Sequence, residues 1–363
     1  MNWPFGRKKV EHKAGTPFDP KGHRLVGLTM ESGAPIWAPK GHSLLLAAAG
    51  GGKTTSGGMP WLFSYAASEP HKAVLVLDSK NGEFAWQAAG MLARMGRKVA
   101  ISCDMGVMPE DCPHRVSLNP FGTVVSATQH DPESLIYAID TITHALIAEP
   151  AEPDERNAYF RAWPRNQAEF GLRTLLKRST ALTIPGGLWA LLSDPEKLRK
   201  FAAIEAEEGD PALKALAANI LEMAGHEHWP QHLEAAQRSV RLFSAGARLH
   251  NAGTGATTTH ADLIKQGAII FLVGNQRHIN RLGPYYALHI LSFIDAMYGG
   301  AGSLRIIADE FTNAPLKSLV ESLTTLRGFS CEVAMIAQSR SEIERRFGRL
   351  ELQTIEENAI VKQ

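Results

Sequence analysis

Six short apolar runs recur along the chain, and they constrain its fold more than any other feature. They are "SLLLAAA" (43–49), "AVLVLDS" (73–79), "KVAISC" (98–103), "AIIFLVG" (268–274), "LRIIADE" (304–310) and "EVAMIAQS" (332–339). The apolar residues are continuous within a run rather than alternating with polar ones, as expected of strands covered on both faces in a parallel sheet. Helical patterns at 83–95 and 313–327 supply covering helices. The pattern therefore predicts a doubly wound α/β fold with a mostly parallel central sheet.

A different pattern fills the chain between the third and fourth runs. No strand-like run occurs from 131 to 246, and apolar residues such as Leu135, Ile139 and Ile142 recur at helical spacing. This stretch carries a net charge of −5, whereas the rest of the chain carries +6. We predict an all-α insertion at 131–246 within a discontinuous α/β domain made of 25–130 and 247–363. Residues 1–24 are interpreted as a basic N-terminal arm, either solvated or in contact with anionic lipid or DNA.

Cysteine content and hydropathy bear on the location of the protein. Cys103, Cys112 and Cys331 form no disulfide pattern, which favours a reducing compartment. No apolar run is long enough to span a bilayer. We expect a cytoplasmic protein without a membrane-spanning segment in this chain, with peripheral contact at the inner face of the cell membrane as an alternative.

The first apolar run leads into a glycine-rich segment, "AAAGGGKTT" (47–55). Alanine stands at 47, where the usual G-x-x-x-x-G-K-[ST] motif has its first glycine, but the preceding strand and following helix are the context that the motif requires. Glycines let backbone N–H groups point at phosphate oxygens, while Lys53 would reach the β and γ phosphates of ATP and Thr54 would ligate Mg²⁺. The predicted nucleotide contacts are Gly50, Gly51, Gly52, Lys53, Thr54 and Thr55.

An acidic pair ends the run "LRIIADE" and complements this loop. Asp309 would hold Mg²⁺ through water, and Glu310 would take a proton from the attacking water or orient it. Paired acids at a strand end can also merely cap a helix, but together with the glycine-rich loop they predict a P-loop ATPase. Two further strand ends point to the same edge: Gln338 suits a sensor of the γ-phosphate, and the role of Asp78 stays open between a site residue and a structural one.

The ordered series of motifs resembles the conjugative coupling proteins of type IV secretion systems (the TraG/TraD type), from about residue 22 to the end. The "AAAGGGKTT" loop is similar to the family's "APTGSGKT", "MPWLF" to "iPnLl", and "LNPF" (118–121) to "NP-[LF]". The block "ADEFTNAPLKSLVESLTTLRGFSCEVAMIAQSRSEIERRFG" is similar to "DEF…R-G…Qs…ql…YG".

This resemblance implies a RecA-like ATPase that assembles as a homo-hexamer and uses ATP and Mg²⁺. It implies that Glu310 and Gln338 are catalytic, and that Arg327 is an arginine finger reaching into a neighbouring subunit's site. The helical insertion would correspond to the family's all-α domain, which meets relaxase, accessory proteins or DNA.

Three features depart from the family pattern. The N-terminal transmembrane helices of the family are missing from this chain. The stretch 78–83 has one residue more than the family's D-x-K-G-E, so the roles of Lys80 and Glu83 are not carried over. The sequence ends at "TIEENAIVKQ", where the family continues, so we expect a shortened chain or a shortened relative that lacks the last strand.

The main hypothesis is an ATP-driven coupling protein that recruits a relaxase–DNA complex and pumps single-stranded DNA to the secretion channel. Expected partners are single- or double-stranded DNA, relaxosome proteins and channel components. Because the insertion is acidic, we expect it to bind protein and the α/β domain to bind DNA, where Arg345 and Arg346 either face a DNA channel or form a solvated face. The alternatives are a nucleotide-binding docking module with little turnover, and another RecA-like DNA translocase or helicase.

Overall fold

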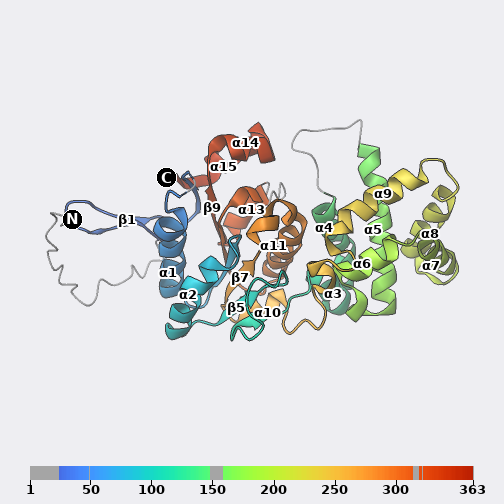
Figure 1. Cartoon of the computed structure of the whole chain (residues 1–363), viewed down its shortest axis with the longest axis horizontal. Helices are drawn as coiled ribbons and strands as arrows, with labels where there is room; N and C mark the ends of the chain where they lie inside the picture. Colours follow the sequence, from blue (N-terminus) through green and yellow to red (C-terminus); the bar gives the residue numbers. More distant parts are fainter. Residues whose placement is uncertain (1–23, 49, 148–157, 314–318, 321, 363) are drawn as a thin grey trace.

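The computed structural model describes residues 24–48, 50–147, 158–313, 319–320 and 322–362. The predicted arm at 1–24 thus lies outside the described residues except for its last position. The fold is a parallel sheet with helices on both faces, flanked by a lobe of helices (Figure 1).

The central sheet has eight strands in the order β10-β3-β9-β8-β4-β7-β5-β6, and every neighbouring pair is parallel. The strands are β3 (His42–Leu46), β4 (Ala73–Asp78), β5 (Val99–Ser102), β6 (Arg115–Val116), β7 (Ile269–Val273), β8 (Leu304–Ala308), β9 (Glu332–Ala337) and β10 (Ala359–Lys362). All six apolar runs form strands of this sheet, which confirms the predicted parallel α/β fold.

Four strands were not predicted. β1 (Arg24–Leu28) and β2 (Pro35–Ala38) form a separate antiparallel pair, while β6 and β10 lie at the two edges of the main sheet. Most of the described side chains of these strands are partly buried or exposed, so the strands lack the continuous apolar signal of the central strands. Residues close to the end of the sequence therefore add an edge strand beside β3.

Each face of the sheet has its own hydrophobic core, because successive side chains of a strand point to opposite faces. On one face, Val74 and Val76 of β4 pack with residues of α1 (Met59–Ser68) and α2 (Glu83–Arg94). On the other face, Leu75 and Leu77 belong to the core that contains α10 (His260–Lys265), α11 (Gly283–Tyr298) and α13 (Leu323–Gly328). The predicted helix at 83–95 is confirmed.

The predicted helix at 313–327 is described only in part. Residues 314–318 and 321 lie outside the described residues, and α13 occupies the last part of the predicted range and one residue beyond. After β9, the chain continues through α14 (Arg340–Phe347) and α15 (Arg349–Asn358).

Among the described residues between β6 and β7, only helices and turns occur. The α-helices are α3 (Gly122–His130), α4 (Leu135–Leu146), α5 (Ala158–Arg178), α6 (Pro185–Leu192), α7 (Pro195–Glu208), α8 (Pro211–Met223) and α9 (Trp229–Val240), followed by α10 directly before β7. Short 3-10 turns accompany them at Pro132–Ser134, Thr180–Leu182, Arg241–Phe243 and Arg248–Asn251. The helical content agrees with the predicted insertion, while its boundaries at 131 and 246 stay a prediction.

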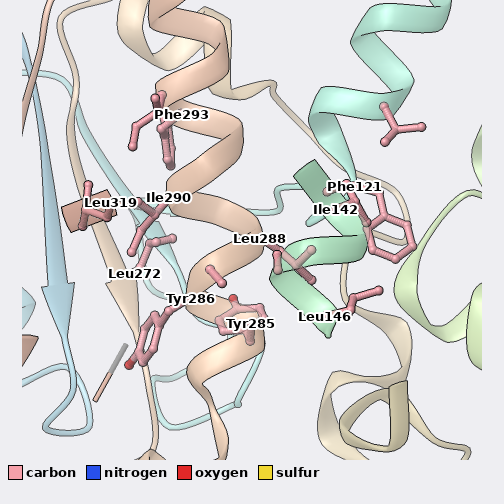
Figure 2. Close-up of a cluster of buried hydrophobic side chains, with 14 of the residues drawn as sticks. Phe121, Ile142, Leu146, Leu272, Tyr285, Tyr286, Leu288, Ile290, Phe293 and Leu319 are labelled. Carbon is pink, nitrogen blue, oxygen red and sulfur yellow. The ribbon is translucent and has the colours of Figure 1, made fainter. Parts of the chain in front are cut away.

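Helix α11 joins the sheet to the helical lobe (Figure 2). Ile290 and Phe293 lie on the side of α11 that faces Leu272 of β7, and Leu288 lies toward Ile142 of α4. Ten side chains of α11 are buried, as expected of a helix covered on nearly all sides. The two parts of the chain consequently share one hydrophobic core.

Candidate active site

The candidate site lies where β3, β9, β8 and β4 end, since the carboxyl ends of parallel strands meet at one edge of a sheet. The glycine-rich loop follows β3 and leads through a π-helical turn, η1 (Thr54–Gly58), into α1. Gly50 and Gly52 have φ angles of 77° and 72°, a left-handed conformation that glycine adopts without strain. Loop and helix N-terminus are therefore arranged as a phosphate-binding loop requires.

Lys53 lies inside the site rather than in solvent. Its side chain is only 4% exposed, and its Nζ lies 3.1 Å from Glu310 Oε1 and donates to the Ala47 carbonyl oxygen at 3.3 Å. The structure thus brings together two predicted site residues from opposite ends of the chain. Thr55 does not join them; it is exposed, and its hydroxyl donates to the Gly52 carbonyl oxygen.

Thr54 and Asp309 also meet, and their contact would let Asp309 ligate Mg²⁺ directly, whereas the sequence analysis predicts a contact through water. The Thr54 hydroxyl donates a hydrogen bond to Asp309 Oδ2 at 2.9 Å. That separation suits two neighbouring ligands of an octahedral Mg²⁺, which lie about 3 Å apart when each is about 2.1 Å from the ion. The other carboxylate oxygen, Asp309 Oδ1, is buried and has no hydrogen-bond partner among the described residues. The pair therefore fits a hard cation.

Glu310 adopts an unusual backbone conformation, with a φ of 53°. Such a left-handed conformation is uncommon for a residue with a side chain and occurs often at functional sites. Gln338, at the end of β9, donates through Nε2 to Glu310 Oε2 at 3.2 Å. Gln338 is thus placed to respond to whatever Glu310 contacts, which suits a sensor.

Lys80, to which the sequence analysis assigned no role, also lies in the site. Its Nζ donates to Thr54 Oγ1 at 3.3 Å and lies 3.7 Å from Asp309 Oδ2 and 3.6 Å from Glu310 Oε1. Glu83 of the same segment lies elsewhere: it is exposed and accepts a hydrogen bond from Gln87. The lysine follows β4, which pairs with the β8 strand that leads to Asp309, and this pairing of strands distant in sequence brings it into the site.

Asp78 organises the loop that carries Lys80. Its carboxylate accepts hydrogen bonds from the backbone N–H of Lys80 at 3.2 Å and of Ala85, in the first turn of α2, at 2.9 Å. Burial raises the pKa of Asp78 to about 6, and the neighbouring Asp309 adds to this effect while the backbone hydrogen bonds oppose it. Of its two roles left open by the sequence, the structural one accounts for these contacts.

Burial likewise raises the pKa of the Asp309 carboxyl, and the Lys80 charge and the Thr54 hydrogen bond oppose the rise. The positive charges of two lysines thus balance the negative charges of two carboxylates within a largely buried cluster of Lys53, Lys80, Asp309 and Glu310.

Arg327 lies away from this cluster. It is exposed in the last turn of α13, which leads into the amino end of β9, whereas Gln338 follows the carboxyl end of that strand. At about 3.3 Å per residue, the six residues of β9 separate the two ends of the sheet by roughly 16 Å or more. Its action on a neighbouring subunit stays a prediction.

A basic cluster lies at the same edge of the sheet as the candidate site. Arg277, His278, Asn280 and Arg281, from the 3-10 turn η7 (Gln276–Arg281) after β7, line an open cavity of about 440 Å³. Arg346 of α14 donates a hydrogen bond to Asn280 Oδ1 at 3.2 Å. This contact brings a further positive charge next to η7. Arg346 therefore lies beside η7, and whether Arg345 and Arg346 face DNA stays a prediction.

Comparisons with known proteins bear on the family. Residues 303–363 match the family model described as the TraM recognition site of TraD and TraG. No curated protein sequence matches the chain. No helix in the described part of the chain combines the length and hydropathy needed to cross a bilayer.

Solved structures of the conjugative coupling protein TrwB share the fold. An unbound form of TrwBdeltaN70 has 15% sequence identity and a TM-score of 0.65, covering 93% of this chain and 70% of TrwBdeltaN70. TrwB in complex with ADP and Mg²⁺ has 16% identity and a TM-score of 0.65, covering 92% of this chain and 73% of TrwB. A complex of TrwB with a non-hydrolysable ATP analogue has 16% identity and a TM-score of 0.64, with the same coverage.

These matches extend over the sheet and the helical lobe, so the predicted RecA-like fold with an all-α insertion is confirmed. The resemblance to the TraG/TraD-type coupling proteins is confirmed with it, by the family model at the C-terminal end and by the TrwB structures over the whole described fold.

Proposed function

We propose that the chain is the motor part of a conjugative coupling protein, an Mg²⁺-dependent ATPase that drives single-stranded DNA toward a secretion channel. The observation that carries the proposal is the meeting of Lys53 and Thr54 with Asp309 and Glu310 at one edge of the sheet. A phosphate-binding lysine, a hydroxyl, a metal-binding carboxylate and a second carboxylate are the parts that P-loop ATP hydrolysis needs.

Each residue has a distinct role in this proposal. Lys53 binds the β and γ phosphates, and the loop at 50–55 surrounds them with backbone N–H groups. Thr54 and Asp309 hold Mg²⁺, which when bound neutralises the phosphate oxygens. Lys53 turns toward phosphate and releases Glu310, and Glu310 then orients the attacking water. Gln338, bonded to Glu310, reports that change to β9 and to the helices that follow.

Assembly completes the site. Arg327, exposed at the amino end of β9, acts in the site of a neighbouring subunit of a homo-hexamer, where a cation stabilises charge on the transferred phosphoryl group. A solved structure with the same fold is described as a bacterial conjugative coupling protein, which supports a role of the present chain in conjugation.

DNA would bind to the positive surface formed by η7 and Arg346. Contacts of arginine with phosphate are insensitive to sequence and weaken with salt, which suits a motor that handles any transferred strand. The acidic helical lobe would bind relaxase, and the segment 303–363 would bind a TraM-like accessory protein, in agreement with the description of the matching family model.

The test is Mg²⁺-dependent ATP hydrolysis by this chain, with and without single-stranded DNA, at two salt concentrations. Lys53→Ala and Glu310→Gln should both abolish turnover, whereas Lys40→Met, which removes an exposed lysine paired with Glu69, should not. DNA-stimulated turnover that salt weakens would support the proposal. Nucleotide binding without turnover would instead favour the docking module. This outcome is worth testing because Lys53 and Glu310 are paired with each other in this structure.

A further inference from the structure

We propose that Lys80 is a built-in competitor of the divalent cation: its ammonium group and the metal bind the same oxygens, so the metal must displace Lys80 in order to enter. The inference rests on the proposed use of Mg²⁺ at this site. Neither the sequence motifs nor the similar proteins assign Lys80 an effect on metal affinity.

The contacts of Lys80 are those expected of a cation in a metal site. Its Nζ donates to Thr54 Oγ1 at 3.3 Å and lies within 4 Å of both Asp309 Oδ2 and Glu310 Oε1. Thr54 Oγ1 and Asp309 Oδ2 are also the oxygens that would ligate the metal. Two cations that contact the same oxygens in a largely buried cluster repel each other, so the bound states exclude one another.

The loop holds Lys80 in this position through several independent contacts. Asn81 and Gly82 have φ angles of 58° and 81°, and Asp78 accepts a hydrogen bond from the Lys80 N–H. The positive φ of Gly82 favours glycine, and a Cβ there would lie 2.9 Å from Met108 Sδ, so the Met108 side chain would have to shift. Asn81 Oδ1 also accepts from the backbone N–H of Gln276 at 2.9 Å. The backbone is therefore fixed, and only the flexible side chain of Lys80 can respond.

Lys80 also has a way out of the site. Its side chain is 28% exposed, whereas the side chains of Lys53 and Asp309 are 4% and 3% exposed. A four-carbon stem can swing its ammonium group toward solvent or toward phosphate without moving the backbone. Lys80 can thus neutralise Asp309 and Glu310 when no metal is bound and withdraw when one enters.

The experiment measures binding of Mn²⁺ alone, as a probe for Mg²⁺, from the loss of the electron paramagnetic resonance signal of free Mn²⁺. Lys80→Met should bind Mn²⁺ at least roughly fivefold more tightly than the unchanged chain, because the competing charge is gone. Lys80→Arg, which keeps the charge, should bind no more tightly, and Lys40→Met should match the unchanged chain. Adding Asp309→Asn to Lys80→Met should abolish the gain, which assigns the bound ion to this site.

Equal, weaker or undetectable Mn²⁺ binding by Lys80→Met would overturn the inference. Circular dichroism checks that each variant is folded, and Lys80→Gln replaces Lys80→Met should the latter misfold. A second titration, of a fluorescent ATP analogue against Mg²⁺, separates the two proposals. Failure of the unchanged chain to bind the analogue would count against the proposed function alone, since Mn²⁺ binding without nucleotide still reports on Lys80.

Discussion

Lys53 and Glu310 form an ion pair in which the Nζ and Oε1 atoms lie 3.1 Å apart and both side chains are more than nine-tenths buried. The residue proposed to bind phosphate and the residue proposed to orient water therefore neutralise each other. In the proposed function, a nucleotide phosphate would compete with Glu310 for Lys53, so its binding would free the carboxylate from Lys53. Nucleotide binding and activation of water would then be linked through Lys53.

Breaking this pair should destabilise the fold. We expect Lys53→Met to lower the free energy of unfolding by about 1–3 kcal/mol, less than for a fully isolated buried charge because Lys80 remains 3.6 Å from Glu310 Oε1. Urea unfolding at pH 7 measures the change. Lys53→Met combined with Glu310→Gln should recover part of the loss, since no buried carboxylate is then left without its closest lysine. A double variant no more stable than Lys53→Met would contradict this.

Asp78 should make stability depend on pH. Its pKa is raised from 3.8 to about 6 in the folded chain, so the folded state binds its proton more tightly than the unfolded state does. Its contribution is most favourable below pH 3.8 and is lost as the pH rises through 6, by up to roughly 3 kcal/mol. The stability of Asp78→Asn relative to the unchanged chain should therefore improve between pH 4 and pH 7. Urea unfolding at these two pH values measures the difference, and a difference that does not change with pH would rule out the effect.

Arg327 should act between subunits. Arg327→Ala should leave binding of a fluorescent ATP analogue unchanged and reduce turnover by roughly 10³-fold, the scale of other arginine fingers. Mixing Arg327→Ala with Lys53→Ala chains should restore part of the turnover, because an assembly then contains sites with an intact Lys53 beside subunits with an intact Arg327. Steady-state ATP hydrolysis over a series of mixing ratios measures this. If the chains assemble but turnover does not recover at any mixing ratio, Arg327 does not act in a neighbouring subunit's site.

The basic cluster should determine the salt dependence of DNA binding. Arg277→Ala and Arg281→Ala should each weaken binding of single-stranded DNA and reduce the slope of log K against log salt by about 0.7–1. Fluorescence anisotropy over a range of salt concentrations gives both quantities. Arg199→Ala, an exposed change in α7 of the helical lobe, is the matched control and should change neither. If all three changes altered DNA binding and its salt dependence equally, the basic cluster would not be the DNA-binding surface.

The central strands and the site motifs could be predicted because each leaves a local signal. β4, β7, β8 and β9 are buried on both faces, so their sequences are mostly apolar, with Asp78, Arg305 and Glu332 as the charged exceptions. The glycine-rich loop and the acidic pair each follow such a strand, and the parallel sheet then brings their ends together without further information.

What the sequence did not predict depends on contacts between distant segments. Lys80 enters the site because Asn81 and Gly82 turn the backbone and Asn81 bonds to the loop after β7, which no local pattern of 78–83 announces. Helix α11 is buried on nearly all sides, so its apolar residues lack the one-sided spacing that marks a surface helix. The edge strand β10 forms only because β3 offers it a partner.

The double role of α11 has a practical consequence for chimeras of this protein. Leu288 packs toward α4 while Ile290 and Phe293 pack toward the sheet, so a deletion of 131–246 would strip the cover from one side of a helix that the sheet needs. Such a deletion variant should expose apolar surface and aggregate. An exchange of the helical lobe with that of a relative should succeed only if α3, α4 and α11 are transferred together.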